Sequence, residues 1–483
     1  MEKIWNIARK SIISCLGLCI LVIFCYSLVE ANGIKFNEND IGPYVVNGII
    51  AIAILMLFIG AKRIIEKVSS SKIKYVKIAI IVFIVLGQIF IINSIKSVQV
   101  KDAFFVQDSA LSIVNNNSSI SENSNGYFSR YSNNNFCLVL TVLLFKMFIK
   151  INLNSTIGFA LFNTIMIDLG ILFTYLLCKK IGNNRMECKI LLFHALNPVT
   201  YLFIYWFYTN TYSIPFMALI MYLAVLIKKS LGNVKKEIIY SIAMGACIAI
   251  AYLLRPVIII PLIACVICVL ISLLLKKIKL KDILVPVIII FICFITTFYG
   301  VSKIMDKYIQ TSESCFPATH WVMMGLTGDG TYNDESVKLT SSYKTKQEMQ
   351  SANIKEIKKI LKEYKIAGLV KHLAIKLPIT WSNGVSAYSG KISQGNNQND
   401  AYIWLVTEKN DFVKIYCQAF RIVTLLLCLI GIYSLRKNKK IDFYFLNNLT
   451  ILGAIMFYLL WEAKTDYSIP FLAYLFILAI KRT

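Results

Sequence analysis

Long blocks of apolar residues recur along almost the whole chain and restrict it to one class of protein. One of them is "YVKIAIIVFIVLGQIFIINSI", residues 75–95. Such blocks have roughly the length needed to cross the ~30 Å hydrocarbon core of a bilayer. The chain has 483 residues, 57% hydrophobic and 16% charged, and a soluble protein could not bury so much apolar surface. We therefore expect an all-α polytopic membrane protein.

The apolar blocks predict about 12 to 13 transmembrane helices. One further block, residues 136–149, is short and contains Lys146, which favours an interfacial or re-entrant segment. A basic loop on the unexpected side of the membrane is the alternative. The predicted spans are residues 11–29, 44–61, 78–95, 155–178, 190–207, 213–227, 238–254, 257–275, 283–300, 414–435, 442–460 and 467–480.

The formal net charge of +25 lies mostly in short loops between these spans. Cytoplasmic loops carry an excess of Lys and Arg, so the basic loops predict the cytoplasmic side, with both termini on it. This accounts for the charge without nucleic acid, and we expect no nucleic-acid partner. The prediction is a multi-pass protein of the cell membrane, with the lipid bilayer around it. The basic clusters are residues 62–77, 179–189, 228–236, 276–281 and 436–440.

The predicted topology divides the chain into four regions. Residues 1–77 form an additional N-terminal transmembrane hairpin. Residues 78–300 form a transmembrane core with an outer loop at 96–135. Residues 301–413 form a large extracytoplasmic loop, in which helical spacing of apolar residues predicts short amphipathic surface helices. Residues 414–483 form the C-terminal transmembrane helices.

Two carboxylates follow the predicted span 78–95 in the stretch "KDAFFVQDSA". If residues 102–114 form a helix, Asp102 lies on its half-buried face and Asp108 points about 120° away, toward water. A partly desolvated carboxylate is the better general base, because its pKa rises toward the working pH. Asp102 is therefore the first candidate base and Asp108 the second. The alternative is a helix N-terminal Asp stabilised by the helix dipole.

Two of the 8 Arg residues are candidates for binding an anion. Arg255 lies in "IAIAYLLRPVIIIPLIA", at the outer end of a predicted hairpin and far from any other charge. An Arg there is costly unless it meets an anion such as a lipid phosphate, and snorkelling to ordinary headgroups is the alternative. Arg130 lies between two Tyr residues in "YFSRYSNNNF", where an interfacial aromatic belt is the alternative.

Three further stretches on the predicted outer side contain candidate substrate-binding residues. "FPATHWVMMGLTGDGTYN" contains His320 and Trp321, and "ITWSNGVSAYSG" contains Trp381. Aromatic and glycine-rich loops of this kind can close over a sugar, although a lone His is often structural. "LLWEAKTDYSIPFL" contains Glu462 and Lys464, where Lys464 could hold a phosphate and Glu462 could orient it. A short solvated turn is the alternative there.

The order of these motifs resembles bacterial GT-C glycosyltransferases, the superfamily of the protein O-mannosyltransferases and the lipid A aminoarabinose transferases. The matching elements are the outer Asp after an early span, "YF..Y.NN", "NP…YTNT.S.PF", "HWVMMGL…G.Y", "W.NG" and "WEAK..Y..PF". No single motif is specific, but their order and their common side support the resemblance across most of residues 96–475.

The resemblance implies transfer of a sugar from a polyprenyl-phosphate donor to an extracytoplasmic glycan, lipid or protein, with inversion at the anomeric carbon. It implies that Asp102 deprotonates the acceptor, with Asp108 as the second choice, and that Arg255 holds the carrier phosphate. Glu462 and Lys464 would then lie at the donor site. His320 and Trp321 would lie near the substrates.

Some positions depart from the family pattern. Asn210 stands where related sequences commonly have Asp, which weakens a metal role, although a divalent metal stays possible and no other cofactor is expected. Asp466 stands where a basic or neutral residue is typical. The alternative function is a transporter or flippase of a lipid-linked saccharide, which would have charges scattered through several spans and small outer loops.

Overall fold

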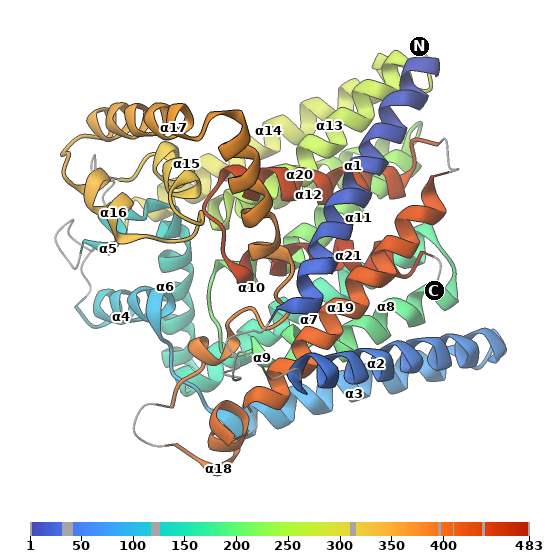
Figure 1. The fold of residues 1–483 in the computed structure, drawn as a ribbon, viewed down its shortest axis with the longest axis horizontal. Coiled ribbons are helices and arrows are strands. Elements are labelled where there is room, and N and C mark those ends of the chain that lie inside the picture. The colour runs from blue at the N-terminus through green and yellow to red at the C-terminus, as the bar shows by residue number, and fades with distance from the viewer. Residues whose placement is uncertain are drawn as a thin grey trace.

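The computed structural model describes residues 2–30, 42–116, 126–309, 315–394, 398–408, 410–436 and 440–481. Within these ranges all regular secondary structure is helical, and one isolated antiparallel bridge joins Val98 and Ser393 (Figure 1). The all-α prediction is therefore confirmed. The long apolar helices are α1 (Glu2–Val29), α2 (Gly42–Lys67), α3 (Ile73–Ile95), α6 (Asn135–Lys150), α7 (Ser155–Ile181), α11 (Ile214–Ser230), α12 (Val234–Leu254), α13 (Ile259–Leu274), α14 (Leu280–Met305), α19 (Asn410–Leu435) and α20 (Phe443–Leu460).

Shorter helices connect these elements and form most of the loop regions. They are α4 (Lys101–Asn116), α5 (Tyr127–Arg130), η1 (Ser132–Asn134), α8 (Asn184–Leu196), α9 (Val199–Leu202), α10 (Thr209–Tyr212), η2 (Pro256–Ile258), α15 (Ala318–Leu326), α16 (Asp334–Ser341), η3 (Tyr388–Lys391), α18 (Asp400–Ile403), η4 (Trp404–Glu408), η5 (Thr465–Phe471) and α21 (Leu472–Ala479). A long bent helix, α17 (Lys346–Trp381), lies between α16 and η3.

In the described part of the chain, 11 helices are long and apolar enough to cross a membrane. The protein is therefore a multi-pass integral membrane protein. The number is below the predicted 12 to 13, partly because the predicted span 190–207 is not one helix. α8 ends at Leu196, Asn197 is extended, and Pro198 follows. A residue before Pro avoids the helical conformation, and Pro has no N–H to continue the helix.

The predicted span 467–480 also differs from a single long helix. It consists of the 3-10 segment η5, which contains Pro470, followed by the short helix α21. Together they form an apolar helical stretch, Thr465–Ala479, that is shorter than a typical span. The irregular first half places the polar end of this stretch inside the protein, next to α10.

The segment 136–149, predicted to be interfacial or re-entrant, forms α6. By length and composition alone, Ser132–Lys150 would suffice to cross a membrane. Figure 1 nevertheless shows α6 running across the direction of α7 and α19, at the end of the molecule where α4 and α5 lie. α6 packs against α4. This orientation agrees with the interfacial interpretation.

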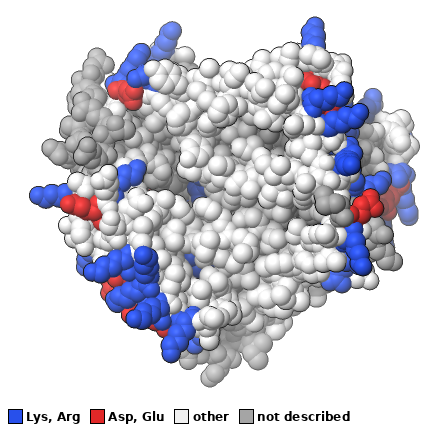
Figure 2. All heavy atoms as spheres, turned by 90° about the horizontal axis from the view of Figure 1, so that it is seen from above, with Lys and Arg blue, Asp and Glu red and all other residues white. Residues whose placement is uncertain are grey.

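Charged side chains gather at two opposite ends of the molecule, with a broad uncharged band between them (Figure 2). Contacts join several basic clusters at one of these ends, which we call the basic end. Lys229 donates to the carbonyl of Lys180, and Lys228 donates to the carbonyl of Ile441 at 3.1 Å. Both termini and the α2–α3 connection lie at this end (Figure 1). The opposite end, with α4, α5, α15 and α16, is called the loop end.

The predicted N-terminal hairpin is packed into the rest of the bundle. α1 and α2 both lie against α19, near the C-terminus of the chain. Phe58 of α2 stacks on Phe193 of α8 with 4.3 Å between ring centroids, and Trp5 of α1 lies edge-on to Phe445 of α20 at 5.0 Å. Both helices of the predicted hairpin therefore pack against the rest of the bundle through one face.

At the loop end, α17 holds the glycine-rich loop that follows α15. The helix bends at Lys365, whose φ of 51° and ψ of −170° are non-helical, and then turns back toward the bundle (Figure 1). Tyr364 donates to the carbonyl of Leu326 at 2.8 Å, and Lys376 donates to the carbonyl of Gly325 at 2.5 Å. These bonds fix the position of the loop after α15, next to the segment that joins α20 to η5.

Candidate functional site

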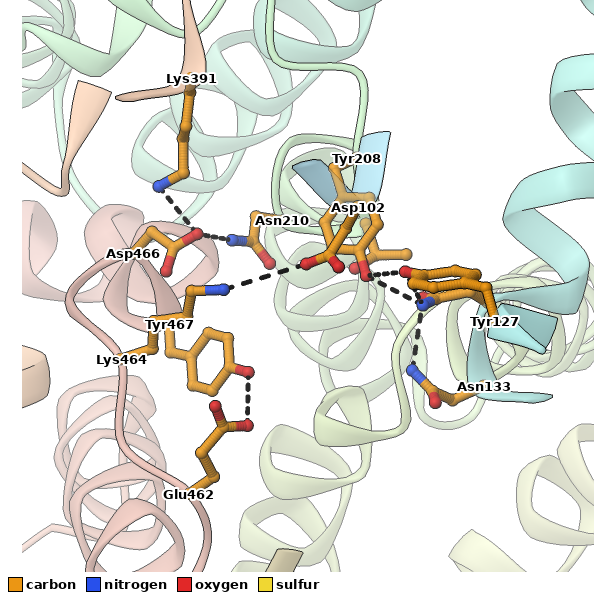
Figure 3. Close-up of polar contacts among 12 residues, drawn as sticks. Asp102, Tyr127, Asn133, Tyr208, Asn210, Lys391, Glu462, Lys464, Asp466 and Tyr467 are labelled. Carbon is orange, nitrogen blue, oxygen red and sulfur yellow. Dashed lines mark hydrogen bonds and ion pairs between the residues drawn. The ribbon is translucent and has the colours of Figure 1, made fainter. Parts of the chain in front are cut away.

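The segment between α20 and η5, residues 461–464, is the centre of a cluster of charged side chains (Figure 3). The backbone is extended at Trp461 and at Lys464. Its position is fixed by two bonds to the α15 region. The Glu462 N–H donates to the carbonyl of Trp321 at 3.1 Å, and the Ala463 N–H donates to the carbonyl of Gly330 at 2.8 Å.

Asp466 is the most buried carboxylate of the cluster, and its Oδ2 atom has two partners, whereas its buried Oδ1 atom has none among the described residues. Lys391 forms an ion pair with its Oδ2 atom at 2.9 Å, with both side chains almost inaccessible. Asn210 donates to the same oxygen at 2.6 Å. Burial alone would raise the pKa of Asp466, but Lys391 and Lys464 outweigh that effect, so its pKa is lowered and it stays ionised. Asp466 therefore acts as a fixed negative charge.

Arg255 reaches the same cluster from the end of α12. Its guanidinium donates to Oδ1 of Asn210 and, at 3.3 Å, to the hydroxyl of Thr209. It also lies over the ring of Tyr467, 4.7 Å from the centroid. Among the described residues, no carboxylate lies within 4.0 Å of Arg255. Its positive charge is therefore held by neutral groups and is available to an anion.

Asp102 lies in the first turn of α4, on the other side of Lys464. Its Oδ2 atom is 4.0 Å from Lys464 Nζ, and the two side chains are 37% and 44% exposed. Asp108 is exposed on the same helix. The predicted helix at 102–114 and the predicted difference in burial between the two acids are both confirmed.

Three tyrosines, Tyr127, Tyr131 and Tyr208, lie near Asp102, whose negative charge contributes to the rise in their pKa values. Tyr127 and Tyr208 lie 3.3 Å apart through their hydroxyls, and Asn134 donates to both at 2.9 Å. Burial raises the pKa of Tyr127 far above its usual value, with further contributions from Tyr208 and Asp102. Burial is also the main reason that the pKa of Tyr131 rises to about 12. These hydroxyls stay protonated and can serve as hydrogen-bond donors beside the carboxylate.

Glu462 is buried and faces Tyr467, whose hydroxyl donates to its Oε2 atom at 3.0 Å. Burial raises the pKa of Glu462, against the opposing effect of Lys464. Burial disfavours the charged form of Lys464, but Asp466, Asp102 and Glu462 outweigh it, so the pKa of Lys464 is raised. Lys464 is therefore a stable cation between the carboxylates.

Aromatic rings line the cluster on the side of α15. Trp321 and Trp461 are partly buried and have centroids 6.1 Å apart. Tyr131 lies edge-on to Trp321 at 6.1 Å. This wall provides flat apolar surface beside Glu462, of the kind on which a sugar ring can stack.

The structure therefore brings together five of the nine residues predicted for the site: Asp102, Arg255, Trp321, Glu462 and Lys464. Four predicted residues lie elsewhere or face away.

Asp108 and Arg130 are exposed, away from the contacts described above. His320 is buried, with Nδ1 2.7 Å from the hydroxyl of Thr340, and it supports α15 and α16. Trp381 is buried against Tyr458 and Phe471 and therefore packs in the core.

Sequence reasoning missed two cations. Lys391 lies in a polar loop where a Lys usually faces solvent, and its ion pair with Asp466 arises only from the fold. Lys376 is buried on α17, where burial lowers its pKa to about 8. In the sequence Lys376 is one of many Lys residues along α17, and nothing in the pattern distinguishes it as buried.

The donor set does not fit a divalent metal. Within the described residues, no three His, Cys, Asp or Glu side chains are grouped closely enough to hold an ion. Asp102 lies next to the ammonium group of Lys464, and Asp466 is paired with that of Lys391. These positive charges repel a metal cation.

Comparison with protein families gives a match over nearly the whole chain. The model of a family described as "Conserved hypothetical integral membrane protein" matches residues 6–482. The chain belongs to this family. A search of the curated proteins gives no match. Membership agrees with the multi-pass architecture and describes the chain as an integral membrane protein.

Proposed function

We propose that this protein is a membrane glycosyltransferase. It transfers a sugar from a polyprenyl-phosphate carrier to an extracytoplasmic cell-envelope glycan, lipid or protein, with inversion. The observation that carries this proposal is the arrangement around Lys464: the half-exposed carboxylate of Asp102 lies on one side, and Arg255, which has no acidic partner among the described residues, lies beyond Tyr467. One base and one cationic clamp are what displacement of a phosphate leaving group requires.

In the proposed reaction, Asp102 accepts the proton of an acceptor hydroxyl. The acceptor oxygen forms a bond to the anomeric carbon while the bond from that carbon to the phosphate oxygen breaks. The electron pair of the broken bond goes to the departing polyprenyl phosphate, whose charge Arg255 and Lys464 neutralise. Attack opposite to the leaving group inverts the anomeric carbon. Trp321 and Trp461 supply the surface for a sugar ring.

The proposed side of the reaction follows from the charge distribution. Contacts hold basic clusters together at the end that also contains both termini, and such clusters are typical of cytoplasmic loops. We therefore place the termini in the cytoplasm and the loop end, with its cluster around Lys464, outside.

The test measures transfer from labelled polyprenyl-phosphate sugars by the purified protein in liposomes. Asp102→Asn should lower the rate by about 10²- to 10⁴-fold, the range that loss of a general base produces. Asp108→Asn, on the same helix but exposed, is the matched control and should keep near wild-type activity. Equal activity of wild type and Asp102→Asn would exclude Asp102 as the base.

Transport of a lipid-linked saccharide is the second candidate, because some charged groups lie within the spans. Asp168 of α7 accepts a hydrogen bond from Gln88 at 2.8 Å, and Arg421 is buried in α19. A transporter would move labelled lipid-linked saccharide across the liposome membrane without forming a new glycosidic bond. In that case the saccharide would stay bonded to its lipid carrier in both the wild type and Asp102→Asn, and the substitution would not change the product.

A further inference from the structure

Arg421 is a cation buried in the membrane bundle, apart from the cluster around Lys464. It lies near the middle of the transmembrane helix α19, about 16 Å from its first residue at 1.5 Å per residue. Its side chain is buried, and the residue is only 4% exposed. Its Nη2 atom donates to the hydroxyl of Ser468 at 3.3 Å, whereas its buried Nη1 atom has no hydrogen-bond partner among the described residues.

The charge of this side chain is also uncompensated in the described part of the chain. No carboxylate there lies within 4.0 Å of Arg421. A buried charge without a partner is strongly unfavourable in a low-dielectric interior, so intramembrane Arg residues pair with an anion or face a cavity. The Ser468 hydroxyl alone cannot neutralise a guanidinium.

A small cavity lies next to this guanidinium. It has room for about one water-sized sphere and is open only in part to the surroundings. It adjoins the break between α8 and α9, where Asn197 and Pro198 interrupt the helix. The lining of the cavity includes Asn197, Pro198, Thr424, Leu472 and Phe476 besides Arg421.

Arg9 shows how the same protein stabilises a buried guanidinium that has a partner. Arg9 is 1% exposed and donates to the carbonyls of Leu435 at 3.3 Å and Arg436 at 3.0 Å. Those carbonyls end α19, where the helix dipole is negative, so the cation is compensated by the backbone. Arg421 lies in the middle of the same helix and has no such compensation.

We propose that Arg421 and the adjacent cavity form a binding site for a monatomic inorganic anion of the size of chloride. The small volume of the cavity favours a monatomic ion over a phosphate, a sulfate or a lipid headgroup. The charge of Arg421 favours an anion over a neutral water molecule.

The test measures the thermal unfolding midpoint of the purified full-length protein at constant ionic strength, with chloride titrated against gluconate. The wild type should gain several degrees as chloride rises, with saturation, because a ligand that binds only the folded state stabilises it. Arg421→Gln should lose this dependence. Arg9→Gln is the matched control for a buried Arg, and its midpoint should still rise with chloride.

A second measurement needs no variant, which covers the case that Arg421→Gln fails to fold. Bromide replaces chloride in crystals of the wild type, and an anomalous difference peak is expected beside Arg421 Nη1. A wild-type midpoint that is equal in chloride and gluconate would overturn the proposal, as would crystals without bromide at this position. Either result would leave a water molecule in the cavity.

Discussion

Asp102 and Asp466 both interact electrostatically with Lys464, but their surroundings give the two carboxylates different chemistry. Asp466 is buried and shares its Oδ2 atom between Lys391 and Asn210. Asp102 is 37% exposed at the side chain and touches one cation at 4.0 Å. A carboxylate that a substrate can reach can accept its proton, whereas a buried carboxylate held in a short ion pair fixes the geometry of its neighbours. The assignment of the base to Asp102 follows from this difference.

The residues predicted from sequence divide according to the strength of their physical signal. Arg255 was identifiable because a charge inside an apolar stretch is costly, and Asp102 because it follows a span on an amphipathic helix. Lys391 had no comparable signal, because its partner Asp466 is distant in the sequence. Trp381 was misassigned because aromatic residues pack in cores as readily as they stack on sugars.

His320 gives a prediction at the residue scale. Burial lowers the pKa of its imidazole to about 4, from 6.5 in the unfolded chain. Between these values the unfolded state binds more protons, so stability rises with pH from about 4 to 6.5 and is constant above. The wild type should lose on the order of 3 kcal/mol of unfolding free energy as the pH falls through this window. His320→Gln should lose less, as measured by denaturant unfolding at a series of pH values.

The corresponding control concerns the intrinsic effect of the substitution. At pH 7, where the imidazole is neutral in both states, the two proteins differ by the hydrogen bond to Thr340 and by the ring contacts with Phe316 and Trp321. The difference between them should therefore shrink as the pH falls. An identical pH dependence in both proteins would contradict the assignment to His320.

At the scale of elements, the length of the apolar blocks located most spans, and Pro positions explain the exceptions. Apolar length alone predicted a span at 190–207, but Pro198 breaks it into α8 and α9. The same rule applies to η5 with Pro470. Both irregular segments reach the interior of the bundle, where they provide Ser468 and the break at Asn197. The length of an apolar block therefore predicts membrane embedding better than it predicts a continuous helix.

The bend of α17 gives a prediction at this scale. Lys365 has a φ of 51° and a ψ of −170°, a conformation that is favourable only for Gly. Lys365→Gly should raise the unfolding free energy by about 1 kcal/mol, because it removes backbone strain. Lys365→Ala is the matched control, since it removes the side chain and keeps the strain. Thermal unfolding of the two variants should separate them, and equal midpoints would exclude strain at this residue.

The whole molecule has two chemically distinct ends separated by an uncharged band (Figure 2). Two basic clusters that lie at the same end must be separated by an even number of crossings. α6 runs across the bundle, so α3 and α7 give the two crossings needed between the basic clusters at 62–77 and 179–189 (Figure 1). The sequence left this point open, because length and composition of residues 132–150 also suit a span. Only the direction of α6 in the fold distinguishes the two topologies.

This arrangement predicts which loops are reached from outside the cell. A short epitope inserted after Gly232, between α11 and α12, has open space around it and lies at the basic end. An epitope after Ser342, between α16 and α17, is exposed at the loop end. In intact cells freed of their wall, an antibody should bind the Ser342 epitope at once and the Gly232 epitope only after permeabilisation. Retained thermal stability of both proteins controls for folding. The reverse pattern would place Asp102 and Lys464 in the cytoplasm, where nucleotide-activated sugars are available and a polyprenyl-phosphate donor is unnecessary.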